Sequence, residues 1–79
     1  MTIEQIIKDV EKEVDRAISL HQPFNSPHEG YAVLLEKVDE LWDEVKKNHS
    51  RRDKDLMRTE AIHAAAMAIR FIKDCCNGD

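Results

Sequence analysis

Apolar residues recur every three or four positions in three long segments of this 79-residue chain, and that spacing predicts amphipathic α-helices. The expected helices span about residues 3–20, 27–47 and 54–75. Aromatic residues make up only 5% of the chain, a composition that suits helices better than a β-sandwich. We therefore expect an all-α fold with one helical domain over residues 1–79. The apolar positions are Ile3, Ile6, Ile7, Val10, Val14, Ala17 and Ile18, then Tyr31, Leu34, Leu35, Val38, Leu41, Trp42 and Val45, then Ala61, Ile62, Ala65, Met67, Ala68, Ile69, Phe71 and Ile72.

Residues that favour helix ends flank all three segments. Thr2 and Gln5 have the spacing of a capping box at the first helix. Ser26 is a good N-cap for the second helix, with Pro27 at the first helical position and Glu29 placed to complete a capping box. Candidate caps of the third helix are Ser50 or Asp53 at its start and Asn77-Gly78 near its end.

The third helix is apolar over a wider arc than one packed side requires. A helix of this kind is usually buried on two sides. A chain of this length buries only about 60% of the surface that it exposes when unfolded, so its own core is small. Only two other helices are expected here, and the second apolar side therefore predicts a partner subunit. We expect a homodimer or a homotetramer.

Charge and hydropathy exclude several classes of partner. The formal net charge of −4 argues against nucleic acid, because phosphate backbones select for clustered Lys and Arg. No apolar run reaches the roughly 20 residues needed to span a bilayer, so no membrane partner is expected. The first residues lack the basic and apolar regions of a signal peptide. Cys75 and Cys76 are adjacent, which is poor geometry for a disulfide, and together these features predict reduced thiols in a cytoplasmic protein.

Acidic residues lie on the second helix opposite its apolar stripe. Glu36, Glu40 and Glu44 are spaced four residues apart and fall within about 80° of one another around the helix. Like charges at this spacing repel slightly, so something should offset them. Solvent and nearby bases such as Lys37 are one explanation. A hard divalent cation such as Mg²⁺, which binds carboxylate oxygens, is the other.

Glu60 occupies a different environment on the third helix. It lies within about 40° of Met67 and Phe71 around the helix, so it should face a packed region. A carboxylate there is costly unless it is paired, hydrogen-bonded or bound to a metal. His63 follows one turn later on the same edge, and a Glu-x-x-His pair that faces an acidic helix is one way to hold a metal ion.

These residues resemble two motifs of the MazG-like family of all-α nucleoside triphosphate pyrophosphohydrolases. The family has a helix that carries EExxE and a following helix that carries ExxD. The matching segments here are Glu36-Lys37-Val38-Asp39-Glu40 and Glu60-Ala61-Ile62-His63, separated by nineteen residues. The likeness covers about residues 25–75 and is that of a short, divergent subgroup.

The resemblance implies a fold, an activity and a set of site residues. It implies a three-helix MazG-like protomer that completes a helical bundle by homo-oligomerisation. It also implies that acidic side chains hold Mg²⁺ against the phosphates of a nucleoside triphosphate, which water cleaves to the monophosphate and pyrophosphate. Glu36, Glu40, Glu60 and His63 would be the metal ligands. Apart from the resemblance, we expect Lys37 to contact a phosphate as a point charge, and we expect Arg58 to contact the substrate because it lies half a turn from Glu60.

Two motif positions depart from the family pattern. Lys37 replaces a Glu and, while charged, can contact phosphate but cannot bind a cation. His63 replaces an Asp, and neutral imidazole suits Mn²⁺ better than Mg²⁺. A non-catalytic helical assembly protein that keeps the scaffold therefore stays as the alternative function. A redox di-metal protein is a third reading, but it needs two Glu-x-x-His motifs and this chain has one.

Overall fold

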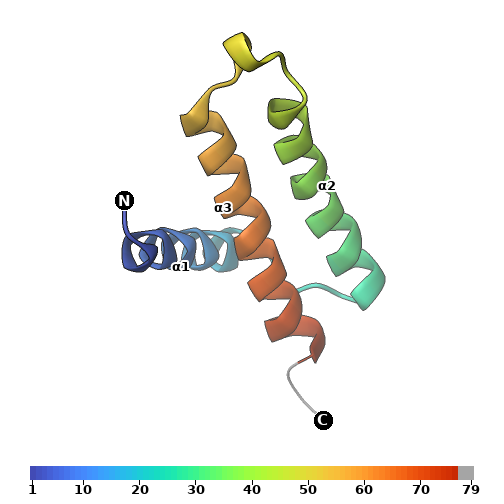
Figure 1. Ribbon diagram of the computed structural model, residues 1–79. Helices are drawn as coiled ribbons and strands as arrows, with labels where there is room; N and C mark the ends of the chain where they lie inside the picture. Colours follow the sequence, from blue (N-terminus) through green and yellow to red (C-terminus); the bar gives the residue numbers. More distant parts are fainter. Residues whose placement is uncertain (77–79) are drawn as a thin grey trace.

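A computed structural model describes residues 1–76. Helix α1 spans Ile3–Leu20, α2 spans Pro27–Val45 and α3 spans Lys54–Phe71, with a short 3-10 turn, η1, at His49–Arg51. A π-helical turn, η2, continues α3 over Ile72–Cys76. The described residues contain no strand, and this confirms the all-α expectation (Figure 1). None of the described helices is both long and apolar enough to cross a membrane.

The predicted start of each helix is confirmed. Thr2 forms the expected capping box with Gln5. The Ser26 hydroxyl accepts a hydrogen bond from the backbone N–H of Glu29 at 3.1 Å, but the Glu29 carboxylate accepts from Asn25 and not from the N-cap residue. At α3, Asp53 is the N-cap, while the other candidate, Ser50, lies within η1. The proposed C-cap at 77–78 lies outside the described residues.

Helix α2 ends two residues earlier than the sequence predicts. Its last regular residue is Val45, and Lys46 and Lys47 belong to the connection instead. The Arg52 guanidinium reaches back from this connection and donates to the Val45 carbonyl oxygen at 2.8 Å. A cation here satisfies a carbonyl that has no partner within the helix.

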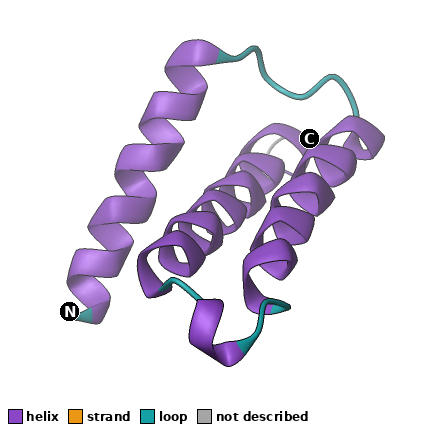
Figure 2. Cartoon of the chain, turned by 90° about the horizontal axis from the view of Figure 1, so that it is seen from above, coloured by secondary structure: helices purple, strands orange, loops and turns teal. Residues whose placement is uncertain are grey.

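Helices α2 and α3 form an antiparallel pair, and α1 crosses α3 at a steep angle (Figures 1 and 2). Few apolar side chains of the described residues are buried: Val10 and Ala17 of α1, and Ala66 and Met67 of α3. Val14, Phe24, Val33 and Leu34 pack around Ala17, Ala66 and Met67. The core therefore lies where α1 crosses the pair, and much of α2 and α3 lies beyond it.

The chain exposes more surface than a compact monomer of its mass. Its accessible surface is 5982 Å², whereas a folded monomer of 9.2 kDa is expected to expose about 4,900 Å². The radius of gyration is 13.6 Å, against about 11.6 Å for a globular chain of this length. The shortest extent, 20 Å, corresponds to about two helix diameters. The fold is flat, and a third layer of helices does not cover it.

A close contact between α2 and α3 depends on a glycine. A Cβ atom added to Gly30 would lie 2.8 Å from a ring carbon of Phe71 and 3.1 Å from one of Phe24. We expect Gly30→Leu to lower the free energy of unfolding by about 1–3 kcal/mol, because the added side chain overpacks this contact. Urea denaturation measures the effect. Ala32→Leu, at an exposed position of the same helix, should change stability by less than about 0.5 kcal/mol.

Two charged residues near the end of α3 fix the loop between α1 and α2. The Arg70 side chain is 97% buried (3% exposed), donates to the Gln22 carbonyl oxygen at 3.1 Å and stacks on the Phe24 ring at 4.4 Å. Asp74 accepts the Phe24 backbone N–H at 3.0 Å. Burial works to raise the pKa of Asp74, but the Phe24 N–H, Lys73 and Arg70 outweigh it and hold that pKa below its usual value.

We expect Asp74→Asn to destabilise the protein by about 1 kcal/mol at pH 7, because a charge-assisted hydrogen bond becomes a neutral one. A lowered pKa contributes stability above the unfolded value of 3.8, and this contribution is lost as the pH falls through the folded-state pKa. The difference between the two proteins should therefore shrink as the pH falls below 3.8 and disappear once the pH is below the folded-state pKa of Asp74. Thermal unfolding followed by circular dichroism across this range measures it, with exposed Asp15→Asn as the control. An unchanged difference at low pH would contradict the assignment.

The two cysteines are free, as the sequence predicts. The Cys75 thiol lies 3.8 Å from the Ser26 carbonyl oxygen. Burial raises the pKa of Cys75, and the neighbouring Cys76 and Asp74 raise it further. A thiol with a raised pKa stays protonated at neutral pH and is a poor nucleophile.

Candidate metal centre and adjoining pocket

Three potential metal ligands come together between α2 and α3. One ligand atom each from Glu40, Glu60 and His63 lies within 4.8 Å of the other two, and all three residues are partly buried. Glu40 comes from α2, and the other two lie one turn apart on the side of α3 that faces it. Three of the four predicted metal ligands are therefore neighbours in space.

Glu60 is in a packed environment, as its position on the helix predicts. Its Oε2 atom is buried and accepts no hydrogen bond within the described residues. Burial is the main cause that raises the pKa of Glu60, and the adjacent Glu40 carboxylate adds to it. His63 and Lys37 act in the opposite direction and do not cancel the rise. Ionised Glu60 is thus left short of a partner.

Basic side chains surround this trio. The Lys37 ammonium lies 3.6 Å from a Glu40 carboxylate oxygen. His63 lies between two carboxylates, with Nδ1 3.8 Å from Glu60 and Nε2 4.0 Å from Glu13 of α1. Glu13 is itself held by the Arg16 guanidinium at 2.6 and 2.9 Å, and this contact lowers the pKa of Glu13. Acid and base therefore alternate across the site.

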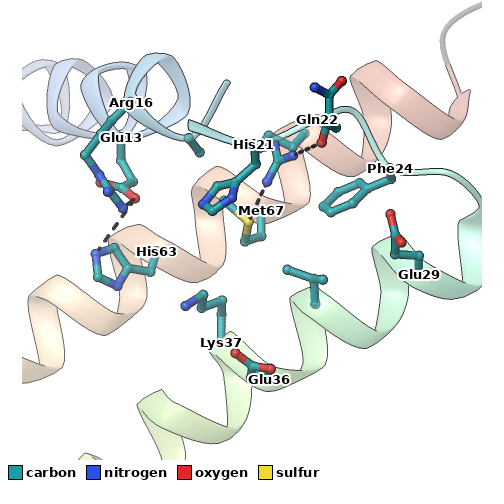
Figure 3. Close-up of a pocket in the computed structure, with 13 residues that line it drawn as sticks. Glu13, Arg16, His21, Gln22, Phe24, Glu29, Glu36, Lys37, His63 and Met67 are labelled. Carbon is teal, nitrogen blue, oxygen red and sulfur yellow. Dashed lines mark hydrogen bonds and ion pairs between the residues drawn. The ribbon is translucent and has the colours of Figure 1, made fainter. Parts of the chain in front are cut away.

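A pocket of about 310 Å³ opens beside the trio, between α1, the loop after it, α2 and α3 (Figure 3). Lys37 points into this pocket from α2 (Figure 3). The charged side chains that line it are Glu13, Arg16, Glu29, Glu36, Lys37 and Arg70, and its apolar lining comes from Ala17, Phe24, Val33 and Met67. Its size and mixed lining suit a small polar ligand with an apolar part.

The remaining predicted site residues divide between the pocket and elsewhere. Glu36 lines the pocket but does not join the trio. Arg58 lies away from both, because its guanidinium is bound to Asp9 of α1. Two positions along a helix turn a side chain by about 200°, so Arg58 and Glu60 face different ways despite their closeness in sequence. Glu44, which shares the acidic face of α2, is paired with Lys47 at 2.7 Å.

Glu13 and Arg16 are pocket residues that the sequence motifs did not identify. They lie on α1, whereas both motifs lie on α2 and α3. Glu13 is one of several acidic residues on α1, and its spacing from the others does not distinguish it. Only the crossing of α1 over α3 brings it to His63.

The trio fits a small divalent ion. Ligand atoms around one Mg²⁺ lie up to about 4.2 Å apart, twice a metal–oxygen distance of about 2.1 Å, so small side-chain rotations suffice to close a 4.8 Å cluster. The buried Oε2 atom of Glu60 would gain the hydrogen-bond or metal partner that it lacks.

Comparison of the chain with protein-family models, with curated proteins and with solved structures finds no match.

Proposed function

We propose that this protein is a metal-dependent nucleotide pyrophosphohydrolase of housekeeping type that cleaves a ribo- or deoxyribonucleoside triphosphate to the monophosphate and pyrophosphate. Mg²⁺ is the proposed cofactor, and Mn²⁺ is a second candidate because one ligand is an imidazole. The observation that carries the proposal is the Glu40, Glu60 and His63 trio beside a pocket of about 310 Å³ that is lined by both charged and apolar side chains. A triphosphate requires such a pairing of cation and pocket.

The side chains around the pocket have separate proposed roles. A bound ion would neutralise charge on the phosphates and lower the pKa of a water molecule. Lys37, which is 28% exposed at its side chain, can leave Glu40 to contact a phosphate oxygen. The apolar lining, which includes Phe24 and Met67, suits the flat faces of a nucleobase. Glu36 lies at the pocket without a place in the trio and is positioned to orient water.

The proposed partners are the nucleotide and further copies of this chain, with the protein acting in the cytoplasm. Twelve large apolar side chains of the described residues are exposed, which supports a homo-oligomer. The net charge of −4 and the absence of a membrane-spanning helix among the described residues give no support to nucleic-acid or membrane partners.

The second candidate is a non-catalytic helical assembly protein. The Lys37–Glu40 pair favours it, because an ammonium beside the acidic trio supplies positive charge without any metal. The two functions differ in their response to cations. A ligand that binds only the folded state must raise its melting temperature, so the enzyme should be stabilised by Mn²⁺ and by Mg²⁺, and the assembly protein by neither.

Pyrophosphate release is the decisive measurement. The purified protein is incubated with a panel of ribo- and deoxyribonucleoside triphosphates, with Mg²⁺ or with Mn²⁺, and the monophosphate is identified by chromatography. We expect release that EDTA abolishes. If no nucleotide releases pyrophosphate with either metal at high protein concentration, the hydrolase proposal is wrong and the assembly protein remains.

A further inference from the structure

The two ring nitrogens of His63 face different carboxylates. Nδ1 lies 3.8 Å from Oε2 of Glu60, on the side of the trio. Nε2 lies 4.0 Å from Oε2 of Glu13, on the side of α1 (Figure 3). An imidazole that binds a metal ion through one nitrogen carries a proton on the other, and that N–H group needs an acceptor. Because the His63 side chain is only 28% exposed, the acceptor should come from the protein.

Glu13 has the properties of that acceptor. Its Oε1 atom accepts from Nε of Arg16 at 2.9 Å, and its Oε2 atom accepts from a terminal nitrogen of the same guanidinium at 2.6 Å. Two parallel hydrogen bonds hold the carboxylate in one orientation. Oε2 keeps a lone pair for a second donor. Among the described residues, the cluster of potential metal ligands does not include Glu13, so Glu13 would act on the metal only through His63.

We propose that Glu13 is a positioning residue of the metal centre, whose carboxylate accepts the Nε2–H of His63 and leaves the Nδ1 lone pair free for the metal ion. This inference rests on the metal-dependent function proposed above. The 4.0 Å separation is about 1 Å longer than an N–H···O hydrogen bond, and contacts of this kind are often long before the ligand binds. The Arg16 side chain is 55% exposed and can move with the carboxylate as it approaches the ring.

Glu60 competes with Glu13 for the proton of the neutral ring. Its Oε2 atom is buried without a hydrogen-bond partner and faces Nδ1, so a proton on Nδ1 would satisfy it. That proton would also occupy the nitrogen that faces the trio and would prevent it from binding a cation. The hydrogen bond made by one ring nitrogen decides which tautomer is present. Glu13 therefore supplies, from α1, the contact that favours the tautomer able to bind metal.

Removing the Glu13 carboxylate should weaken metal binding. We expect Glu13→Ala to raise the dissociation constant for Mn²⁺ by about tenfold, as is usual when a metal-bound histidine loses its hydrogen-bond partner. Glu13→Gln keeps an oxygen that can accept from the ring and should bind Mn²⁺ about threefold more tightly than Glu13→Ala. Glu11→Ala is the matched control, because it removes the same charge from an exposed position about 200° away around α1. Isothermal titration with Mn²⁺ alone measures all four proteins, and circular dichroism verifies that they are helical.

A double-mutant cycle separates positioning from a general effect of negative charge. In a His63→Asp protein the ligand at this place has no N–H group to be held. Adding Glu13→Ala to it should therefore change the dissociation constant for Mn²⁺ by less than about twofold, the usual error of additivity. A Glu13 side chain that acted through its charge alone would give the same tenfold loss in both backgrounds, and that result would overturn the proposal.

The tautomer of the metal-free protein is a second readout. The ¹⁵N chemical shifts of the two ring nitrogens, assigned by their absence in His63→Asp, report which of them carries the proton. The neutral ring should be protonated at Nε2 in the wild type, and a larger share should be protonated at Nδ1 in Glu13→Ala. A wild-type ring protonated at Nδ1, or equal Mn²⁺ affinity in the wild type and Glu13→Ala, would overturn the proposal.

None of these measurements requires a nucleotide, so the two proposals can fail separately. Mn²⁺ binding that depends on Glu13, without release of pyrophosphate, would support the positioning role and contradict the hydrolase. Release of pyrophosphate with equal Mn²⁺ affinity in the wild type and Glu13→Ala would do the reverse. A wild type that binds no Mn²⁺ would overturn both.

Discussion

Replacing Glu60 with Gln should lower pyrophosphate release by about 100-fold or more, because a charged metal ligand is worth several kcal/mol of charge stabilisation. The same change should raise the melting temperature of the metal-free protein. The Glu60 carboxylate is buried at Oε2 without a hydrogen-bond partner and lies beside Glu40. The amide that replaces it would carry no charge and could donate a hydrogen bond to the Glu40 carboxylate.

The gain in stability should depend on pH with a defined sign. The pKa of Glu60 is raised in the folded protein above its usual value of 4.5. Below that value the carboxyl is neutral in both states and costs nothing, whereas above the folded-state pKa its ionisation destabilises the fold. Glu60→Gln should thus match the wild type near pH 4 and exceed it at pH 8 by about 1 kcal/mol, which is about 4–8 °C in a domain of this size.

Metal should reverse the order of stability, so that the wild type becomes more stable than Glu60→Gln. Saturating Mn²⁺ should stabilise the wild type. At a Mn²⁺ concentration of 100 times the dissociation constant, the gain in the free energy of unfolding is about 2.7 kcal/mol. The stability of Glu60→Gln should not change when Mn²⁺ is added. Glu44→Gln is the matched control, since that carboxylate belongs to the same acidic helix and is paired with Lys47. Its activity and its response to Mn²⁺ should be those of the wild type. A Glu60→Gln protein that still releases pyrophosphate at the wild-type rate would remove Glu60 from the site.

Replacing Lys37 with Glu should have the second largest effect. It should strengthen the binding of metal and weaken the binding of nucleotide. The Lys37 ammonium lies 3.6 Å from Glu40 and competes with a cation for that carboxylate. Changing its charge from +1 to −1 beside a divalent ion should tighten Mn²⁺ and Mg²⁺ binding by about 10- to 100-fold, after allowance for solvent screening. The KM for the triphosphate should rise about tenfold or more, because a phosphate contact is lost and a negative charge is gained.

The metal-free Lys37→Glu protein should also be less stable than the wild type, because a third carboxylate then lies beside Glu40 and Glu60 and the Lys37 ammonium is lost. Isothermal titration with Mn²⁺ and steady-state kinetics measure the two effects separately. Lys46→Glu is the control, since it makes the same change in net charge beside the exposed Asp43. If Lys37→Glu weakens metal binding, or leaves both constants unaltered, the ammonium does not border the metal site.

The helices and their starting residues could be predicted because both depend on local chemistry. The period of apolar residues is close to that of an α-helix, and Thr2, Ser26 and Asp53 accept backbone N–H groups one turn away or less. The early end of α2 could not be predicted in this way, because Arg52 reaches its last carbonyl from beyond the helix.

The composition of the site was predictable only in part. Glu60 and His63 lie one turn apart on a single helix, so their spacing already placed them together. Whether Glu36 or Glu40 lies beside Glu60 and His63 depends on how far α2 is offset along α3. In the structure it is Glu40 that does so. Arg58 binds Asp9 because α1 crosses α3 beside it.

The sequence by itself determined three helices, the N-caps of the first two and a carboxylate on the packed side of the third, since periodicity and capping act within about one turn of chain. The tertiary structure alone decided that Lys37 lies beside Glu40, that Glu13 and Arg16 of α1 complete the pocket, and that large apolar side chains of α2 such as Trp42 are left exposed. Contacts of this second kind depend on the angle and offset at which helices cross. Many side chains set these jointly, and no local spacing encodes them.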